Sequence, residues 1–210
     1  MLQDKILDAA VEHFGQLGFD GASTREIARA SGTAMSSITY HFGGKEGLYL
    51  AAASHIAAQI STRMAPAVDA MQPMPDDGPG LSREAATGRL LAMLDGFAGM
   101  MLDPTTASWC RFIVREQQQP TAAFERLYDG AMGAMVDVAL AHIRIARPDL
   151  AERQAKALTV MLYGQCLVMR IGRASVSRIL DVTDIGEEEA ALLRQQLRDS
   201  AECILKGVTR

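Results

Sequence analysis

The stretch GTAMSSITYHFGGKEGLY, residues 32–49, decides the fold. It gathers short hydroxyl side chains and a histidine within about two helical turns, and then breaks at Gly43 and Gly44. A buried helix would carry fewer hydroxyl groups, and an ordinary surface helix would carry more charge. The pattern therefore predicts a short helix over residues 35–41 whose polar face contacts another molecule.

Two further short helices are predicted just before this stretch. Apolar residues at a spacing of 3.6 predict a helix from about residue 3, ended by Gly18 as a C-cap. Ser23 and Glu26 form a capping-box pattern, which predicts a second helix over residues 24–32. The second and third helices have the spacing of a helix-turn-helix, in which one helix enters the major groove of DNA.

The remainder of the chain also has a helical pattern, and no alternating strand pattern is present. The fourth helix begins near Lys45 and is expected to end at Pro66, and the Pro/Gly-rich residues 71–80 are expected to form an exposed loop. Further helices are predicted near residues 82–102, 105–118, 120–146, 149–173 and 187–207. The predicted fold class is all-α.

Composition places the chain among soluble globular proteins. It has 210 residues, of which 49% are hydrophobic and 22% are charged. No apolar run approaches the ~18 residues that span a bilayer, and the N-terminus does not resemble a signal peptide, so we expect a cytoplasmic protein without membrane contact. The three cysteines, Cys110, Cys166 and Cys203, are far apart and form no CxxC pair, which argues against a disulfide framework or a metal site.

Net charge does not favour nucleic-acid binding. The formal charge is −4, and within the first 50 residues four Lys and Arg side chains stand against six carboxylates, a balance of −2. Net charge averages over faces that never meet a ligand. A case for DNA must therefore depend on where the few cations and hydroxyl groups lie.

The third predicted helix provides such a local arrangement. Ile38 and Phe42 can point inward, four residues apart. Ser and Thr hydroxyl groups can bond to base edges, and a Thr methyl can contact a thymine methyl. Tyr40, His41 and Lys45 suit phosphate oxygens, as does the N-terminus of the fourth helix. The alternative is a solvated polar helix that happens to carry little charge.

The block from Ile6 to about Ala53, which contains ILDAAVEHF, GASTREIARASG and YHFGGKEGLY, resembles the N-terminal domain of the tetracycline-repressor (TetR) family of bacterial transcription regulators. The resemblance implies a three-helix DNA-binding domain, assigned to residues 1–50, with backbone contacts from Thr24, Tyr40, His41 and Lys45 and base contacts from Met35, Ser36, Ser37 and Thr39. Arg25 completes the predicted DNA-binding set. The predicted partner is a double-stranded, pseudo-palindromic operator.

Two positions depart from the family pattern. Ala34 stands where the family often has Ser or Asp, which removes an N-cap unless Thr33 substitutes in a shifted start. Gly44 stands where Ser, Asn or Asp is common, at a cost of a few tenths of a kcal/mol. Both changes blur the register of the predicted recognition face.

Residues 51–210 are assigned to a ligand-binding and dimerisation domain. The stretch RFIVREQQQPTAAFERLYDGAM, residues 111–132, resembles the CecR-like (YbiH-type) branch of the TetR family, whose members are often linked to efflux or drug-resistance genes. The resemblance implies a small-molecule effector, with no cofactor.

Flexible methionines and aromatic rings along the predicted helices suit an apolar pocket with a few polar groups, so the expected effector is apolar or amphipathic. The predicted effector-binding residues are Met93, Phe97, Met101, Trp109, Phe112, Glu116, Phe124, Tyr128, Met132, Met161 and Gln165. Arg115 and Gln117 are further polar candidates. For any one apolar residue plain core packing is the more common role, and Arg115 and Glu116 also suit a surface ion pair or an interface contact.

The last two long helices predict a homodimer. The stretch ALTVMLYGQCLVMRIGRASV is apolar around most of its circumference, and Gly164 and Gly172 allow close helix approach. The final helix is amphipathic. Together they suit a four-helix bundle with the same pair from a second subunit. The alternative is that they only close the core of one chain.

Enzyme activity is not expected, because no HExxH, GxSxG, Walker or GxGxxG pattern occurs in its structural context. The function that the sequence predicts is a ligand-responsive, DNA-binding transcriptional regulator, a repressor released from its operator by a small molecule. Control by a protein partner or by cysteine oxidation, or action as an activator, would leave the same sequence features.

Overall fold

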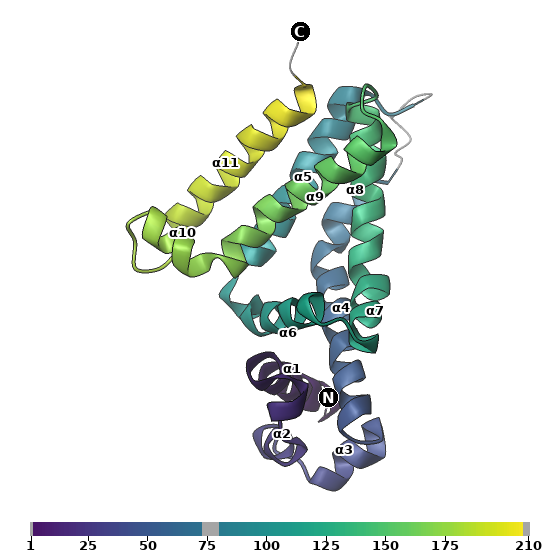
Figure 1. The fold of residues 1–210 in the computed structure, drawn as a ribbon, viewed down its shortest axis with the longest axis vertical. Helices are drawn as coiled ribbons and strands as arrows, with labels where there is room; N and C mark the ends of the chain where they lie inside the picture. The colour runs from purple at the N-terminus through teal and green to yellow at the C-terminus, as the bar shows by residue number, and fades with distance from the viewer. Residues whose placement is uncertain (1, 73–79, 208–210) are drawn as a thin grey trace. The chain divides into compact units, whose positions relative to one another are not determined.

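The computed structural model describes residues 2–72 and 80–207, and every regular element in these two ranges is helical. The all-α prediction is confirmed. The elements are α1 (Leu2–Gly21), α2 (Thr24–Ala30), α3 (Met35–Phe42), α4 (Lys45–Asp69), α5 (Arg83–Leu102), a 3₁₀ turn (Pro104–Thr106), α6 (Ala107–Gln118), α7 (Ala122–Leu127), a π-turn (Tyr128–Met132), α8 (Gly133–Ala146), α9 (Glu152–Ile171), α10 (Arg173–Ile179) and α11 (Glu187–Lys206) (Figure 1). None of these helices is long and apolar enough to cross a membrane.

The chain divides into two compact units, each formed by two separate segments. Unit 1 contains residues 1–62 and 105–134, and unit 2 contains residues 63–104 and 135–210. Unit 1 thus combines α1–α3 and most of α4 with α6 and α7. The assignment of a DNA-binding domain to residues 1–50 remains a prediction, since packing and function can divide a chain at different places.

In unit 1, α6 packs across α1 (Figure 1). Gly15 permits this close approach, because a Cβ atom there would lie 2.7 Å from the carbonyl oxygen of Ser108. An ion pair between Arg111 and Glu12, 2.8 Å long, spans the same two helices. The core of the unit is formed by residues that are at most 1% exposed, namely Ile6, Ala10, Phe14, Ile27, Ile38, Leu48, Ile56, Phe112 and Leu127.

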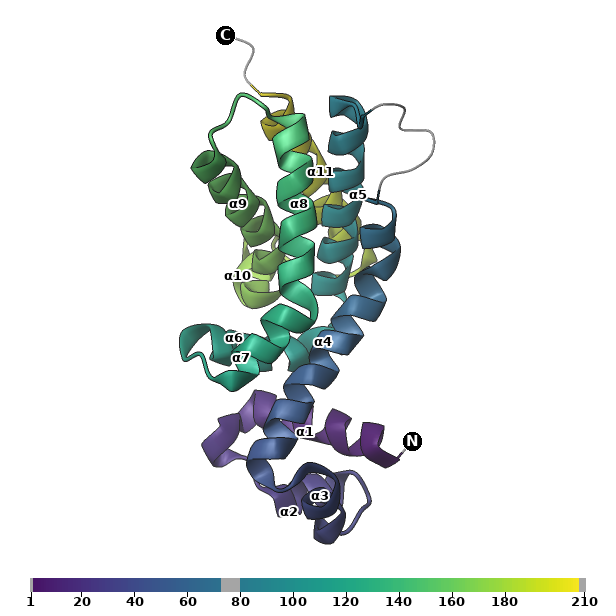
Figure 2. The same cartoon turned by 90° about the vertical axis from the view of Figure 1, so that its right-hand side faces the viewer.

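In unit 2, α5 contacts both α9 and α11, and Figure 2 shows these helices from a second direction. Apolar side chains fill the space between them, among them Leu90, Leu94, Leu162, Leu197 and Leu205. Phe97 of α5 stacks on Tyr163 of α9 with ring centroids 5.2 Å apart. This packing accounts for the apolar stripes that the sequence shows in these helices.

Some predicted helix ends and one predicted cap were wrong, whereas α2 begins at Thr24 as predicted. Ser23 is the N-cap residue of α2, but its side chain makes no capping hydrogen bond, so the capping box does not form. Pro66 lies inside α4, which continues to Asp69. Gly18 has the left-handed φ of 74° that a helix break requires, yet helical residues resume and reach Gly21.

The later elements also differ from the predicted spans. The helix expected near 120–146 contains the π-turn, and the one expected near 149–173 ends at Ile171, after which α10 forms a separate short helix. Periodicity could not separate these segments because their apolar spacing continues across each junction. Of the predicted loop at residues 71–80, positions 73–79 lie outside the described residues.

We expect Gly15→Ala to destabilise the fold, although alanine favours a helix by ~1 kcal/mol over glycine. The new methyl group would press on the backbone of α6 at Ser108, and overpacking of this kind costs roughly 1–3 kcal/mol. Gly88→Ala, in α5, is the matched control, because a Cβ there meets no atom within 4 Å and should gain ~0.5–1 kcal/mol. Urea unfolding measures both, and equal stabilisation of the two variants would contradict the close α1–α6 packing.

Candidate nucleic-acid interface

Helix α3 presents its polar residues to solvent and buries one apolar residue. Ile38 is 1% exposed, whereas Met35 is 50% and Tyr40 is 85% exposed. The inward orientation predicted for Ile38 is therefore confirmed, and Phe42 is half-buried. A tyrosine so fully exposed contributes little to the core, and its ring and hydroxyl group are accessible to a ligand.

All nine predicted DNA-binding residues lie on the surface of unit 1, at α2, α3 and the start of α4. The exposed residues are Arg25, Met35, Ser36, Thr39, Tyr40 and His41, and the half-buried residues are Thr24, Ser37 and Lys45. No Asp or Glu occurs between residues 31 and 45. The face of α3 is thus rich in hydroxyl groups and free of carboxylates that would repel phosphate, whereas exposed Glu26 and Glu46 stand beside Arg25 and Lys45.

The ends of α3 fix the register of this face. Ala34 is the N-cap residue and offers no side-chain hydrogen bond, so the shifted start at Thr33 does not occur. At the other end Gly43 has a left-handed φ of 74°, and its N–H donates to the carbonyl of Thr39 over 3.0 Å. Only glycine adopts this conformation without strain, which explains the break after Phe42.

Lys45 is engaged inside unit 1. Its Nζ donates to the carbonyl oxygen of Asp20 over 3.2 Å and lies 4.8 Å from the centroid of the Phe19 ring. A lysine has three donor protons, so a phosphate contact would use those that remain. Lys45 therefore contributes to the end of α1 in addition to its predicted DNA contact.

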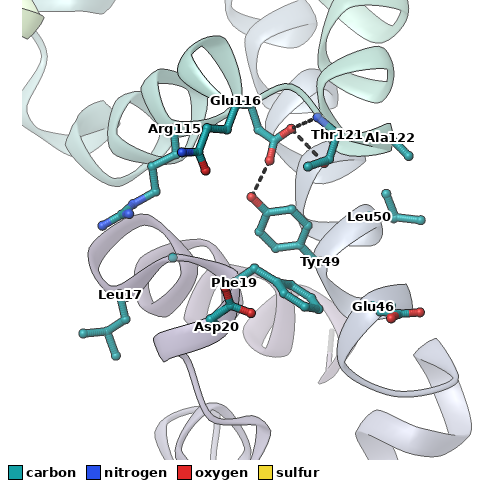
Figure 3. Close-up of a pocket in the computed structure, with 12 residues that line it drawn as sticks. Leu17, Phe19, Asp20, Glu46, Tyr49, Leu50, Arg115, Glu116, Thr121 and Ala122 are labelled. Atoms are coloured by element: carbon teal, nitrogen blue, oxygen red, sulfur yellow. Dashed lines mark hydrogen bonds between the residues drawn. The ribbon is translucent and has the colours of Figure 1, made fainter.

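A buried carboxylate lies in the core of unit 1. Glu116 of α6 is 2% exposed and accepts three hydrogen bonds, from the Tyr49 hydroxyl at 2.6 Å, the Thr121 N–H at 3.0 Å and the Thr121 hydroxyl at 2.9 Å. The Thr121 hydroxyl in turn accepts from the N–H of Ala123 and caps α7. One carboxylate thus joins α4, α6 and α7 (Figure 3).

The aromatic ring of Tyr49 is held as firmly as its hydroxyl group. It stacks on Phe112 with centroids 4.6 Å apart and meets Phe14 edge-on at 4.9 Å. Burial, followed by the hydrogen bond to Glu116, raises the pKa of Tyr49. Tyr49 therefore stays protonated and keeps donating to Glu116 well into the alkaline range.

Arg115 donates hydrogen bonds to backbone carbonyls at the kinked end of α1. The left-handed Gly18 turns the following N–H groups away from the carbonyls that they would meet in a regular helix. Arg115 donates instead, from Nε to the carbonyl of Gly15 over 3.2 Å and from its second terminal nitrogen to Gln16 over 2.9 Å. The interpretation of Arg115 and Glu116 as a surface ion pair is therefore wrong, because each has its own partners.

A cavity of about 570 Å³ opens beside this network (Figure 3). Its lining comes from the kinked end of α1, the first turns of α4, the end of α6 and the start of α7, all within unit 1. The lining residues are Leu17, Gly18, Phe19, Asp20, Glu46, Tyr49, Leu50, Arg115, Glu116, Gln119, Thr121 and Ala122. Of the eleven predicted effector-binding residues, Glu116 alone is among them.

Comparison with known proteins identifies the chain. Residues 6–52 match the family described as "Bacterial regulatory proteins, tetR family". Residues 86–208, more than half of the chain, match "HTH-type transcriptional dual regulator CecR, C-terminal domain". The chain belongs to the TetR family of bacterial transcription regulators. Both resemblances seen in the sequence, to the family and to its CecR-like branch, are confirmed.

Curated relatives support the same assignment. The HTH-type transcriptional dual regulator CecR of Shigella flexneri is 28% identical over 218 residues, which covers 98% of this chain and 92% of the relative. The HTH-type transcriptional repressor AcnR of Corynebacterium glutamicum is 37% identical over 59 residues, 28% of this chain and 31% of the relative. The first similarity therefore extends over both units of the regulator, and the second is local.

Solved structures share the fold. A TetR-like transcriptional regulator from Rhodococcus sp. RHA1 superposes with a TM-score of 0.67 at 20% identity and covers 98% of this chain and 96% of its own. The regulator FadR from Bacillus subtilis, solved in complex with stearoyl-CoA, gives a TM-score of 0.60 at 16% identity, with coverage of 94% and 96%. At these identities the likeness establishes the fold of the regulator.

The predicted effector-binding residues are divided between the two units of this TetR-family regulator. Trp109, Phe112, Glu116, Phe124, Tyr128 and Met132 belong to unit 1, and Met93, Phe97, Met101, Met161 and Gln165 belong to unit 2. The three α5 residues are at most 6% exposed. Met161 was predicted to line the effector pocket, but it is 61% exposed on the outer side of α9.

The sequence-based prediction missed two residues of the hydrogen-bond network around Glu116. Tyr49 and Thr121 both donate hydrogen bonds to Glu116. Tyr49 lies 67 residues from Glu116 in the sequence, and Thr121, five residues away, matches no motif that indicates such a bond. Gln117, a polar candidate, is exposed. Within residues 2–72 and 80–207 no group of three or more His, Cys, Asp or Glu side chains could hold a metal ion.

We expect Tyr49→Phe to lower the free energy of unfolding by ~1.5–3 kcal/mol, because it removes a donor from a buried carboxylate while the aromatic packing remains. The matched control is Tyr40→Phe, which alters an exposed hydroxyl and should change stability by less than ~0.5 kcal/mol. Urea unfolding at pH 7 compares the two variants, and a similar loss in both would contradict the network.

The same comparison has a defined pH dependence. Because the folded-state pKa of Tyr49 is raised, its contribution is complete below pH ~10, the ordinary tyrosine pKa, and declines as the pH rises through the folded-state value. The difference between wild type and Tyr49→Phe should therefore be constant from pH 7 to 9.

Proposed function

We propose that the regulator acts as a homodimeric repressor in the bacterial cytoplasm. It binds a pseudo-palindromic operator through α3 and leaves it when a small apolar or amphipathic effector binds. The observation that carries the proposal is the exposed, carboxylate-free polar face of α3, with Ile38 holding the helix to the core beneath it.

The residues on this face suit two kinds of DNA contact. Ser36, Ser37 and Thr39 carry short hydroxyl groups that can bond to base edges in the major groove, and Met35 offers an apolar surface. The other members of the set, Thr24, Arg25, Tyr40, His41 and Lys45, carry hydroxyl, imidazole or cationic groups that suit phosphate oxygens. This division assigns specificity to α3 and general affinity to its flanks.

An outer stripe on unit 2 supports the homodimer. Val160, Met161, Val168 and Ile171 of α9 are between 52% and 61% exposed, and Gly164 lies among them with no atom within 4 Å of a Cβ added there. Gly164, Val168 and Ile171 follow the adjacent pair Val160 and Met161 at spacings of three or four residues, so these positions share one face of the helix. An apolar stripe of this kind favours contact with the same stripe of a second subunit.

The effector is proposed to bind near the buried methionines and Phe97 of α5, where flexible thioethers can repack around an apolar molecule. FadR from Bacillus subtilis was solved with stearoyl-CoA, a ligand with a long apolar chain, which supports an amphipathic effector for this fold. The ligand would stabilise a conformation with lower operator affinity, by no more than its differential affinity for the two states.

Activation of transcription is an alternative to repression, and the name of one relative supports it. CecR of Shigella flexneri is named a dual regulator, so activation at some promoters is a second candidate. Control by oxidation of Cys166 is less favoured, because burial raises the pKa of its thiol to about 12 and so suppresses the thiolate.

Specific DNA binding is tested with two variants. In competition gel shifts with a fragment from the gene's own promoter, Arg25→Ala should weaken binding to all sequences and lower the salt slope by about one unit. Thr39→Ala should change preference at particular base pairs by roughly 1 kcal/mol. Uniform weakening by Thr39→Ala would refute the assigned face, and sequence-independent binding by the wild type would refute the repressor.

The dimer is tested by Val168→Glu, at the centre of the outer stripe of α9. Two-fold symmetry would place two unpaired carboxylates in the interface, so the dimer dissociation constant should rise by at least ~100-fold. Ala92→Glu, an exposed α5 position, is the matched control. Sedimentation velocity should give about twice the 22.6 kDa chain mass for wild type and control, and a monomeric wild type would contradict the interface.

A further inference from the structure

The cavity beside Glu116 has the size and composition of a ligand site. Its volume of about 570 Å³ lies within the ~300–1,000 Å³ typical of small-molecule pockets. Every lining residue belongs to unit 1, so its walls are positioned by the α1–α6 packing and the Glu116 network. It shares only Glu116 with the effector-binding set predicted from the sequence.

The walls offer an aromatic and aliphatic surface. Phe19 and Tyr49 meet edge-on with ring centroids 5.2 Å apart, and Leu17 and Leu50 add aliphatic surface. Leu17 is 48% exposed, so part of this apolar surface is in contact with solvent. A flat or chain-like apolar group could replace solvent at Leu17, Phe19 and Leu50, which are not fully buried, while Tyr49 is 7% exposed.

The polar groups of the cavity have an excess of negative charge. The lining contains three carboxyl side chains, from Asp20, Glu46 and Glu116, and one guanidinium, from Arg115. The guanidinium is held by the carbonyls of α1, and Glu116 is satisfied by Tyr49 and Thr121. The Asp20 and Glu46 carboxylates accept no hydrogen bond and form no ion pair within residues 2–72 and 80–207.

Lys45, a cation outside the lining, forms no ion pair with either carboxylate among the described residues. The Lys45 ammonium bonds to the backbone carbonyl of Asp20, not to its carboxylate, and covers one face of the Phe19 ring. Asp20 and Glu46 are both exposed, so their side chains are accessible to a cation at the rim of the cavity.

We propose that this cavity is a second small-molecule site, which takes an amphipathic organic cation: an aromatic or aliphatic body bearing a protonated amine. The body would lie against Phe19, Tyr49 and Leu50, and the amine would lie at the rim of the cavity, where the Asp20 and Glu46 carboxylates attract it. The site is distinct from the effector site proposed on α5 and does not depend on it.

Three dansyl compounds that share one fluorophore test the charge preference. Dansylcadaverine carries an ammonium group, dansylamide is neutral and dansylglycine carries a carboxylate. In equilibrium fluorescence titrations of the full chain, dansylcadaverine should bind at least ~10-fold more tightly than dansylglycine, with dansylamide between them. Absence of saturable dansylcadaverine binding up to ~1 mM, or equal affinity for all three, would overturn the proposal.

Isosteric variants locate the bound cation. The pair Asp20→Asn and Glu46→Gln should weaken dansylcadaverine binding by about 3- to 10-fold and leave dansylamide unaffected. The matched control, Glu125→Gln with Asp129→Asn, removes the same charge from exposed residues of unit 1 outside the cavity and should have no effect. Equal weakening by both pairs would mean non-specific attraction and refute the site. The titration needs no operator, so its result is independent of the repressor proposal.

Discussion

The buried carboxylate of Glu116 is the constraint on which unit 1 depends. A carboxyl group that is 2% exposed is stable only where hydrogen-bond partners replace its hydration, and three donors do so here. They come from α4 and from the N-cap of α7, so the carboxylate fixes two elements relative to α6. Its neighbour Arg115 points elsewhere along the same helix and fixes the kinked end of α1. Two consecutive residues thus connect four helices.

The consequence is a packing unit that the order of the sequence does not suggest. The segment 105–134 is distant in sequence from the helix-turn-helix, yet it packs with α1–α3 and the first part of α4. A change at α6 or α7 therefore acts directly on α1 and α4 through these hydrogen bonds. At Gly15 the backbone of α1 lies close to the backbone of α6 at Ser108, with no side chain between them. This close packing leaves little room for the two helices to shift against each other.

The sequence predicted the parts of this structure that depend on neighbours in the chain. The 3.6-residue spacing located the long helices, and Ile38 against the surrounding hydroxyl groups oriented α3 correctly. What it could not predict are partners set by tertiary contact. Tyr49 and Glu116 lie 67 residues apart, and neither has a local pattern that names the other. The Ser23 cap failed for a different, local reason: a motif gives a residue's chemistry but not the geometry of its side chain.

Local placement of charge also resolves the conflict between a net charge of −4 and DNA binding. Residues 31–45 carry no carboxylate, so the face of α3 can approach phosphate without repulsion at contact distance, and more distant charges are screened within about 10 Å at moderate salt. The carboxylates of Asp20 and Glu46 lie instead at the cavity. Between the two regions Lys45 is held to the backbone of Asp20, which keeps a cation at the border of the acidic side. One small unit can in this way offer a polyanion and an organic cation separate surfaces.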